Sequence, residues 1–483
     1  MEKELLDTLR AIVGESNVLD SKQVRERATH FWDSSPLNAR ALVRPANTQE
    51  TSAVLSACHA ANQVVVTHGG VTGLVNGNHS TEHNIILSLE RQQAIENVDA
   101  VGRTISVQAG AILQNVQQAA EEAGLQLGLD LGARGSCTVG GNVATNAGGL
   151  SVLRYGMARE QVLGLEAVLA DGTIVSSMNR MMKNNAGYDL KQLFIGSEGT
   201  LGIITRVVFR LRAATPVIRT TLMAFDNFDS VSTTLRQLDT ALNGTLDAFE
   251  VIWQPFYRLN TDPDRTDTAR SPLSRDFSLY AIAESRSASG TASDDVLEQT
   301  LAQLMDDGFL LDAVVAKSET EAANIWHIRE HIDIALEHDP IFVYDISLPI
   351  ADMQAYVSQL ENDIRQLWPT ALIYVYGHLA DGNLHVLVAP PAIDVDASAL
   401  QKKEQDDKNK IYQQWHKRSN QIVYGPLQDL GGSISAEHGI GLYKKPYLSM
   451  SRNTTEIQLM KVLKQTLDPK GILNRGKIVD LDL

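Results

Sequence analysis

The feature that most constrains this chain is a glycine-rich stretch at residues 136–149, with the sequence SCTVGGNVATNAGG. It holds four glycines among small side chains, hydroxyls and amides, and little that could fill a core. Glycine lets the backbone bend sharply and approach a ligand closely. A loop of this kind can direct several backbone N–H groups at an anion. The stretch therefore predicts a diphosphate-binding loop.

A second loop, GGVTG at 69–73, follows the apolar run 64–66 and is placed to hold the diphosphate from the other side. Neither loop has the G-x-G-x-x-G pattern that opens a Rossmann helix, nor the P-loop pattern G-x4-G-K-S/T. Each glycine taken singly is compatible with an ordinary turn. Their density favours a nucleotide site of a less common kind.

A hairpin at 374–388 predicts a metal clamp. Asp381 and Gly382 stand between two strand-like runs, which is a strong hairpin signal. With these two as the central turn residues, His378 pairs directly with His385. Directly opposed side chains share a face, with Cβ atoms about 4.5–5.5 Å apart, so both imidazoles can bind one metal ion.

A third metal ligand is expected from the glycine-rich segment 431–441, where Glu437 is the candidate and His438 stands beside it. Two histidines and one carboxylate suit Zn²⁺ or a similar divalent ion with open positions for a substrate. The alternative is that each histidine is an ordinary surface or core residue. The identity of the metal stays open.

Residues 319–337 predict a helix that begins with a capping box of Ser318 and Glu321. Arg329 falls on the apolar stripe of this helix, so its guanidinium requires a partner. A substrate carboxylate suits the planar fork of arginine. Asp333, four residues further on, offers an intrahelical salt bridge instead.

Composition excludes several classes of protein. The 483 residues fit two or three domains, and a net charge of −16 argues against a nucleic-acid or anionic-membrane binder. Cys58 and Cys137 are too few for a disulfide framework and suit a reducing compartment. No apolar signal core and no run of 18 apolar residues occurs. We therefore expect a cytoplasmic protein with no membrane segment.

Apolar periodicity predicts an α+β domain over residues 40–213, with many short strands and a hairpin at 162–176. Within it, Asn47 or Thr48 is expected to cap a helix that runs to about residue 62. Strands alternate with helices again from 214 to 430, for example at 246–253, 278–284, 342–348 and 371–377. No internal repeat or coiled-coil heptad is present.

Four segments, at 69–74, 129–150, 154–172 and 184–205, closely resemble the FAD domain of the vanillyl-alcohol oxidase/p-cresol methylhydroxylase superfamily. Within this superfamily the chain resembles the branch of D-2-hydroxyglutarate, D-lactate and glycolate dehydrogenases, from about residue 40 to the C-terminus.

The resemblance implies an α+β fold in three parts. These are a two-subdomain FAD-binding domain of the PCMH type at 1–213 with a helical lead-in, an α+β substrate-binding cap at 214–430, and a C-terminal segment, 431–483, that returns to the flavin domain and completes the active site. It implies FAD contacts at Gly69, Gly70, Val71, Thr72, Gly73, Leu74, Leu131, Gly132, Ser136, Thr138, Gly140, Gly141, Asn142, Thr145, Asn146, Gly148, Glu198, Gly199, Gly202, Ile203 and Asn474.

The same resemblance gives roles to the candidate site. The branch has the pattern H-x6-H followed by E-H, which here makes His378, His385 and Glu437 the ligands of a divalent metal, expected to be zinc, and His438 the catalytic base. The substrate-binding residues it implies are Arg329, Asp333 and Asn383.

Two departures concern the substrate. Relatives that act on 2-hydroxyglutarate have a lysine before the Tyr-Asp-x-Ser-x-Pro run and an asparagine two residues after the second metal histidine, where this chain has Val343 and Leu387. Both changes remove polar partners for a distal carboxylate and favour a monocarboxylic acid. The covalent flavin anchor of some superfamily members follows the Gly-Gly pair, where this chain has Val71, whereas His68 precedes the pair. We therefore expect FAD to be bound non-covalently.

The resulting hypothesis is an FAD-dependent D-2-hydroxy-acid dehydrogenase that oxidises a D-2-hydroxy acid, of the D-lactate or D-2-hydroxyglutarate type, to the 2-oxo acid. Electrons would pass to an electron-transfer flavoprotein, a quinone or oxygen. A homodimer is compatible with the sequence. The alternatives are a metal-independent FAD alcohol oxidase and a non-catalytic flavin-binding protein, since fold does not imply function.

Overall fold

The structure is a computed structural model that describes residues 2–30, 33–288, 290–392 and 402–481. Its contacts divide the chain into two compact units. The first unit comprises residues 1–151, 155–214 and 437–483, and the second comprises 152–154 and 215–436. The C-terminal segment expected at 431–483 is thus divided between them. Ser433 pairs with Ser347 inside the second unit, whereas the chain from Glu437 onward belongs to the first.

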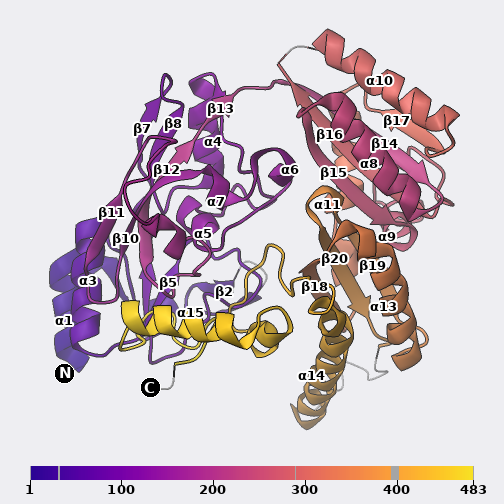
Figure 1. Ribbon diagram of the computed structural model, residues 1–483. Coiled ribbons are helices and arrows are strands. Elements are labelled where there is room, and N and C mark those ends of the chain that lie inside the picture. The colour runs from indigo at the N-terminus through magenta and orange to yellow at the C-terminus, as the bar shows by residue number, and fades with distance from the viewer. Residues whose placement is uncertain (1, 31–32, 289, 393–401, 482–483) are drawn as a thin grey trace. The chain divides into compact units, whose positions relative to one another are not determined.

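The first unit contains two main sheets, with strand orders β1-β4-β6-β5 and β11-β10-β12-β8-β7, and two two-stranded sheets, β13-β9 and β2-β3 (Figure 1). In the smaller sheet β4 and β5 run parallel to β6, and the larger sheet is antiparallel throughout. The strands of the first unit are β1 (Val18–Asp20), β2 (Ala28–His30), β3 (Asp33–Pro36), β4 (Ala41–Val43), β5 (Val65–His68), β6 (Ile85–Ser88), β7 (Ile95–Asp99), β8 (Thr104–Gln108), β9 (Leu125–Gln126), β10 (Val162–Val168), β11 (Ile174–Ser177), β12 (Ile203–Arg210) and β13 (Arg212–Ala213). The longer helices of this unit are α1 (Glu2–Val13), α3 (Thr48–Ala60), α4 (Leu113–Glu122), α5 (Val139–Ala144) and α15 (Thr454–Leu467).

Local signals explain several of these elements. Asn47 caps α3 by accepting a hydrogen bond from the N–H of Glu50, as expected. The hairpin expected at 162–176 is formed by β10 and β11. One apolar core joins α1, α3 and α4 to both sheets. The C-terminal chain enters this core, where Asn474 and Ile472 form backbone hydrogen bonds with Val65 on β5.

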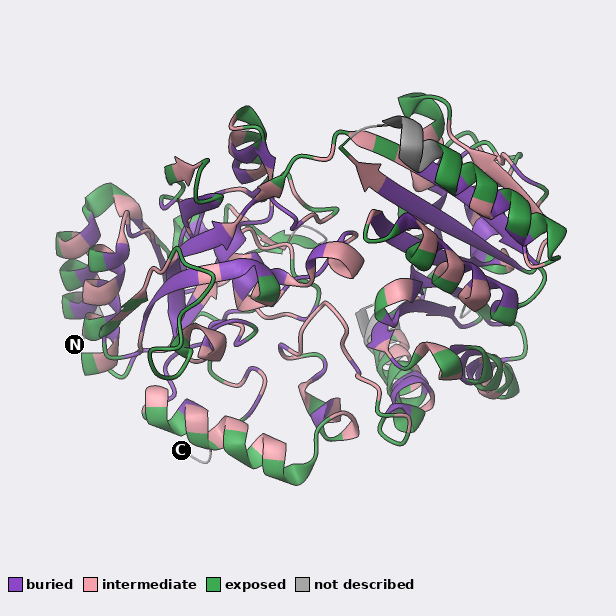
Figure 2. Ribbon diagram, turned by 45° about the horizontal axis from the view of Figure 1, so that its top comes forward, coloured by how far each residue is buried: buried purple, intermediate pink, exposed green. Residues whose placement is uncertain are grey.

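The second unit is built on a seven-stranded antiparallel sheet of order β17-β14-β16-β15-β19-β20-β18. Its central strands are buried and its helices expose one side, as Figure 2 shows. The strands are β14 (Val217–Phe225), β15 (Leu246–Trp253), β16 (Leu279–Ser287), β17 (Asp312–Val315), β18 (Phe342–Ser347), β19 (Leu372–His378) and β20 (Asn383–Ala389), and the longer helices are α8 (Phe228–Leu242), α9 (Gln254–Asn260), α10 (Gly290–Asp306), α11 (Glu319–Glu330), α13 (Met353–Leu367) and α14 (Lys402–Tyr424).

One face of this sheet is covered by α9 and α11 and carries the apolar cluster that includes Tyr376, Leu387 and Ile328. Side chains two residues apart on a strand lie on the same face. The polar side chains of the second unit that form the candidate metal site come from this face. Within the described residues, no helix combines the length and the apolar character that crossing a bilayer requires.

The helix expected at 319–337 is shorter than its periodicity suggested. α11 ends at Glu330, His331 leaves the helical conformation with ψ of 76°, and a separate turn, α12, covers Asp333–Leu336. The expected capping box is also incomplete. Ser318 accepts from the N–H of Glu321, but the Glu321 side chain accepts from Lys317 instead of Ser318.

Candidate functional site

The two glycine-rich loops lie against each other within the first unit. A Cβ on Gly70 would stand 2.3 Å from the carbonyl oxygen of Ser136, and one on Gly69 would stand 2.5 Å from Oγ1 of Thr138. At Gly70 glycine is required because the backbone of one loop approaches the backbone of the other, and at Gly69 because it approaches a side-chain hydroxyl. Gly73, by contrast, faces open space.

Backbone donors distinguish the two loops. In the loop at 136–149 the N–H groups of Val139 and Gly140 donate to the carbonyls of Ala111 and Ala109. Among the described residues, no hydrogen bond from the N–H groups of 69–73 is found. The loop at 69–73 is therefore the better source of N–H donors for a diphosphate, although the sequence drew attention first to the loop at 136–149.

These loops line a pocket that lies wholly in the first unit and contains about 920 Å³ of space between protein atoms, including the part open to solvent. The lining includes the predicted residues Gly69, Gly70, Val71, Thr72, Gly73, Thr138, Gly140, Gly141, Asn142, Thr145, Glu198, Gly199, Ile203 and Asn474, together with Thr67, Val75, Gly77, Asn78, Leu89, Ala144, Ile204 and His438.

Seven residues predicted to contact FAD are absent from this lining, namely Leu74, Leu131, Gly132, Ser136, Asn146, Gly148 and Gly202. Gly202 has a packing role, since a Cβ there would stand 2.7 Å from the ring of Phe194. His68 is buried beneath the pocket wall, where its Nε2 lies 2.8 Å from the carbonyl oxygen of Asn78. Burial lowers the pKa of His68 to about 4.

The loop that carries His438 is held to the first unit at several points. Glu437 accepts a hydrogen bond of 2.8 Å from the N–H of Gly149, and Glu198 accepts from the N–H groups of Ile440 and Gly441. Burial raises the pKa of Glu198, while the two N–H donors and the positive charge of Lys477 act in the opposite direction.

The hairpin of the second unit brings His378 and His385 together, but not by the expected pairing. His385 is directly opposite Tyr376, so the two histidines are diagonal neighbours. The turn is longer than two residues because a 3-10 turn at Leu379–Asp381 precedes Gly382, which closes the loop at φ of 83°. The rings nevertheless share one face, with centroids 5.5 Å apart and a nitrogen of each ring within 4.8 Å of one on the other.

Glu250 on β15 orients His378 and Arg329 and was missed by sequence reasoning. Its carboxylate lies 2.5 Å from Nδ1 of His378 and accepts a 2.6 Å hydrogen bond from Nε of Arg329. All three side chains are buried. Burial alone would raise the pKa of Glu250, but the interactions with His378 and Arg329 lower it to about 2.

This geometry assigns the tautomer of His378. Nη2 of Arg329 lies 3.3 Å from Nε2 of His378, and guanidinium nitrogens only donate. Nε2 is therefore the acceptor, and Nδ1 carries the proton that is donated to Glu250. Arg329 also stacks over the ring of Tyr376 at 4.5 Å. Its ion-pair partner is Glu250, whereas Asp333 lies exposed beyond the end of α11. The alternative of an intrahelical salt bridge is thus wrong.

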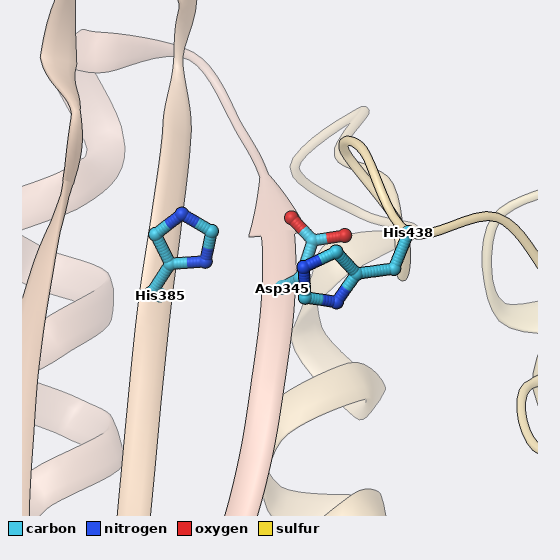
Figure 3. Close-up of side chains that lie close together, drawn as sticks. All are labelled: Asp345, His385 and His438. Atoms are coloured by element: carbon cyan, nitrogen blue, oxygen red, sulfur yellow. The ribbon is translucent and has the colours of Figure 1, made fainter. Parts of the chain in front are cut away.

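A second carboxylate missed in the sequence, Asp345 on β18, lies directly opposite His385 on β20 (Figure 3). Its oxygens accept from the side-chain amide of Asn383 at 2.9 Å and from the hydroxyl of Ser435 at 3.3 Å. Asn383, expected to bind substrate, is only 3% exposed and gives its NH₂ group to Asp345 and to a strand carbonyl. A charged residue inside a largely apolar strand was the available signal for both Asp345 and Glu250.

Val343 and Leu387, the two departures noted above, are directly opposed on β18 and β20. Leu387 is buried in the apolar cluster beside Tyr374, and Val343 is 41% exposed. Val343 and Leu387 lie on the same face of the sheet as Asp345 and His385, two residues away along each strand. This part of the face is therefore apolar.

Family models match both units. The FAD binding domain model covers residues 39–177, and the model for the C-terminal domain of FAD linked oxidases covers residues 215–478. The chain belongs to the FAD-linked oxidases. It is accordingly an FAD-dependent oxidoreductase. The pocket of the first unit, whose lining lies largely within the range matched by the FAD binding domain model, is the site that we propose for FAD and call the FAD pocket below.

Curated relatives refine this position in the family. The chain is 36% identical to D-2-hydroxyglutarate dehydrogenase of Xanthomonas citri, over 94% of this chain and 91% of the relative. It is 38% identical to the mitochondrial D-2-hydroxyglutarate dehydrogenase of Bos taurus, over 92% of this chain and 77% of the relative. The Stutzerimonas stutzeri D-2-hydroxyglutarate dehydrogenase is 31% identical, with 98% of each chain covered.

Solved structures support the fold of this FAD-linked oxidase. p-Cresol methylhydroxylase with substrate bound has a TM-score of 0.75 at 14% identity, with 100% of this chain and 97% of that chain covered. Alkyldihydroxyacetonephosphate synthase has a TM-score of 0.71 at 18% identity, with 98% and 84% covered. At these identities the likeness concerns the fold alone, and it confirms the α+β, PCMH-type architecture.

Proposed function

We propose that this enzyme is a D-2-hydroxy-acid dehydrogenase that converts a D-2-hydroxy acid to its 2-oxo acid. The observation that carries the proposal is the buried cluster of His378, Arg329 and Glu250 beside His385, in a chain whose curated relatives are named as D-2-hydroxyglutarate dehydrogenases. Such a cluster supplies the groups that bind a carboxylate and a metal, neither of which a neutral alcohol would require.

We propose that His378, His385 and Glu437 bind a divalent metal, zinc being the ion that the donor set suits best. The fit at His378 is good because its Nδ1 is held by a carboxylate, which is the usual arrangement for a metal-binding histidine. Glu437 follows Ser435, which donates to Asp345, by two residues. Glu437 is included as the third ligand because the resemblance to the dehydrogenase branch implies it.

The roles of the remaining residues follow from their chemistry. Arg329, which is oriented by Glu250, would hold the substrate carboxylate. His438, on the wall of the FAD pocket, would take the proton of the C2 hydroxyl as general base. When bound, the metal would polarise that hydroxyl, and FAD would accept the hydride from C2. The electrons would pass on to an electron-transfer flavoprotein, a quinone or oxygen.

The side chain of the substrate is proposed to be apolar. Val343 and Leu387 present neither a cation nor an amide to a distal carboxylate. Desolvating a second carboxylate against this surface would be costly. We therefore propose a monocarboxylic acid of the D-lactate type in preference to D-2-hydroxyglutarate.

Anaerobic bleaching of the bound flavin tests the proposal. D- and L-lactate, D-2-hydroxyisovalerate, D-2-hydroxyglutarate and a neutral alcohol are added in turn, before and after verified metal removal. We expect D-monocarboxylic acids to bleach the flavin fastest and chelation to abolish bleaching. Bleaching by L-isomers alone would contradict the stereochemistry, faster bleaching by D-2-hydroxyglutarate would contradict the side-chain assignment, and unchanged bleaching without metal would contradict the ligand set.

A further inference from the structure

The His438 loop, residues 437–443, is held by one carboxylate at two consecutive backbone positions. The N–H of Ile440 donates to Oε1 of Glu198 at 2.7 Å, and the N–H of Gly441 donates to Oε2 at 2.8 Å. Both oxygens of Glu198 are thus engaged two and three residues after His438. A carboxylate that accepts from two amides forms stronger hydrogen bonds than a neutral acceptor would.

Glu198 is itself fixed by its backbone. Its N–H donates to the carbonyl oxygen of Ala144, and its own carbonyl oxygen accepts a 2.6 Å hydrogen bond from the side-chain amide of Asn474. It adopts φ of 50°, in the left-handed region that costs a non-glycine residue free energy. Strain of this kind persists only where the surroundings hold it, and here it directs the side chain at the His438 loop.

The loop is shaped to receive this carboxylate. A Cβ on Gly439 would stand 2.7 Å from Oε1 of Glu198, and Gly439 has φ of 85°. Glycine at this position therefore lets the chain turn directly over the carboxylate. The sequence order of His438 and Gly439 places the imidazole immediately before this turn.

A buried cation accompanies the carboxylate. Lys477 is 3% exposed, and its Nζ has no hydrogen-bond partner among the described residues. Burial raises the pKa of Glu198, and the positive charge of Lys477 acts against this rise together with the hydrogen bonds from the two amides. Burial in turn lowers the pKa of Lys477 to about 7, partly offset by Glu198.

We propose that Glu198 is a positioning residue for His438. Its carboxylate holds the His438 loop at the wall of the FAD pocket, and it acts through His438 instead of binding the flavin. The inference rests on the proposed role of His438 as general base. It replaces the role in cofactor binding that the sequence suggested for Glu198.

Glu198→Gln tests the proposal, since glutamine preserves the size of the side chain but offers one acceptor where two are needed. We expect faster hydrogen exchange at the amides of Ile440 and Gly441. The rate of flavin reduction should fall by about 10- to 100-fold, as small misplacements of a catalytic group do. FAD affinity and the substrate concentration for half-maximal rate should change by less than about 3-fold, because the proposal assigns both carboxylate oxygens to loop amides and none to a ligand.

Glu166→Gln is the matched control. Glu166 is a buried carboxylate of the same unit that binds the hydroxyls of Thr48 and Ser176, away from the His438 loop. It should lower stability without slowing flavin reduction or changing exchange at 440 and 441. If the glutamine variant fails to fold, Glu198→Asp replaces it, since aspartate is one methylene shorter and keeps the charge. The rate of flavin reduction should again fall.

Two results would overturn the proposal. One is a variant of Glu198 that loses FAD affinity but, when saturated with FAD, is reduced at the wild-type rate, which would make Glu198 a cofactor ligand. The other is unchanged exchange at Ile440 and Gly441. If no hydroxy acid bleaches the wild-type flavin, the proposed function fails instead, and the exchange measurement still decides whether Glu198 holds the loop.

Discussion

Glu250 determines how His378 can be used, since its carboxylate takes the Nδ1 proton and leaves Nε2 as the acceptor. Glu250→Gln would place a neutral amide against both His378 and Arg329. We expect metal affinity to fall by about 10- to 100-fold, the usual effect of losing a partner behind a metal ligand. Metal affinity is measured as the fraction of zinc retained during dialysis against increasing concentrations of a chelator.

The control for that substitution is Glu284→Gln, on the neighbouring strand β16. Glu284 is also buried, but it binds Trp326 and Arg286. Its replacement should leave zinc retention unchanged. Equal retention in both variants and the wild type would show that Glu250 does not orient a metal ligand.

His68 predicts a dependence of stability on pH. Burial lowers its pKa from 6.5 to about 4, so the folded chain keeps the ring neutral where the unfolded chain protonates it. The contribution of neutral His68 to the free energy of unfolding is therefore complete above pH 6.5, and it falls by about 3 kcal/mol as the pH drops towards 4.

The measurement is urea unfolding of the apoprotein at several pH values between 4 and 7. His68→Gln, which keeps a donor for the carbonyl of Asn78, should show a smaller loss of stability across this range than the wild type does. Parallel curves for the two proteins would assign the pH dependence to other groups.

At the scale of elements, the contact between the two glycine-rich loops predicts different tolerances for two glycines of one loop. Gly70→Ala would drive a methyl group into the backbone of Ser136 and Cys137, whereas Gly73→Ala meets nothing within 4 Å. We expect the first to lower the stability of the apoprotein by about 1–3 kcal/mol and the second to leave it unchanged. Thermal unfolding without FAD separates this effect from any clash with the cofactor, and equal losses would contradict it.

The elements also show how far local signals reach. The Asp-Gly pair correctly predicted a hairpin and a shared face for His378 and His385, but the two-residue turn assumed for it is wrong. The loop is longer because Leu379–Asp381 form a 3-10 turn whose ending depends on the surrounding chain. The end of α11 could not be predicted from the sequence either, because no glycine or proline marks the break at His331.

For the whole molecule, the division into two units separates the pocket proposed for FAD from the two histidines proposed as metal ligands. The FAD pocket is lined by the first unit alone, whereas His378 and His385 belong to the second. The double substitution of both histidines by alanine should leave FAD affinity within about 3-fold and lower the rate of flavin reduction by more than about 100-fold, if metal assistance is lost. The flavin spectrum and stopped-flow reduction measure the two effects, and joint loss of both would contradict the separation.

The sequence was enough to predict the family, the α+β fold, the two glycine-rich loops and the pair of neighbouring histidines, because each depends on local spacing: glycine density, strand periodicity and a hairpin turn. Tertiary structure alone decided the partners of the charged groups. Glu250 reaches His378 across 128 positions and Glu198 reaches Ile440 across 242. A charged residue in an apolar segment indicates that a buried partner is needed, but only the folded structure shows which distant residue is that partner.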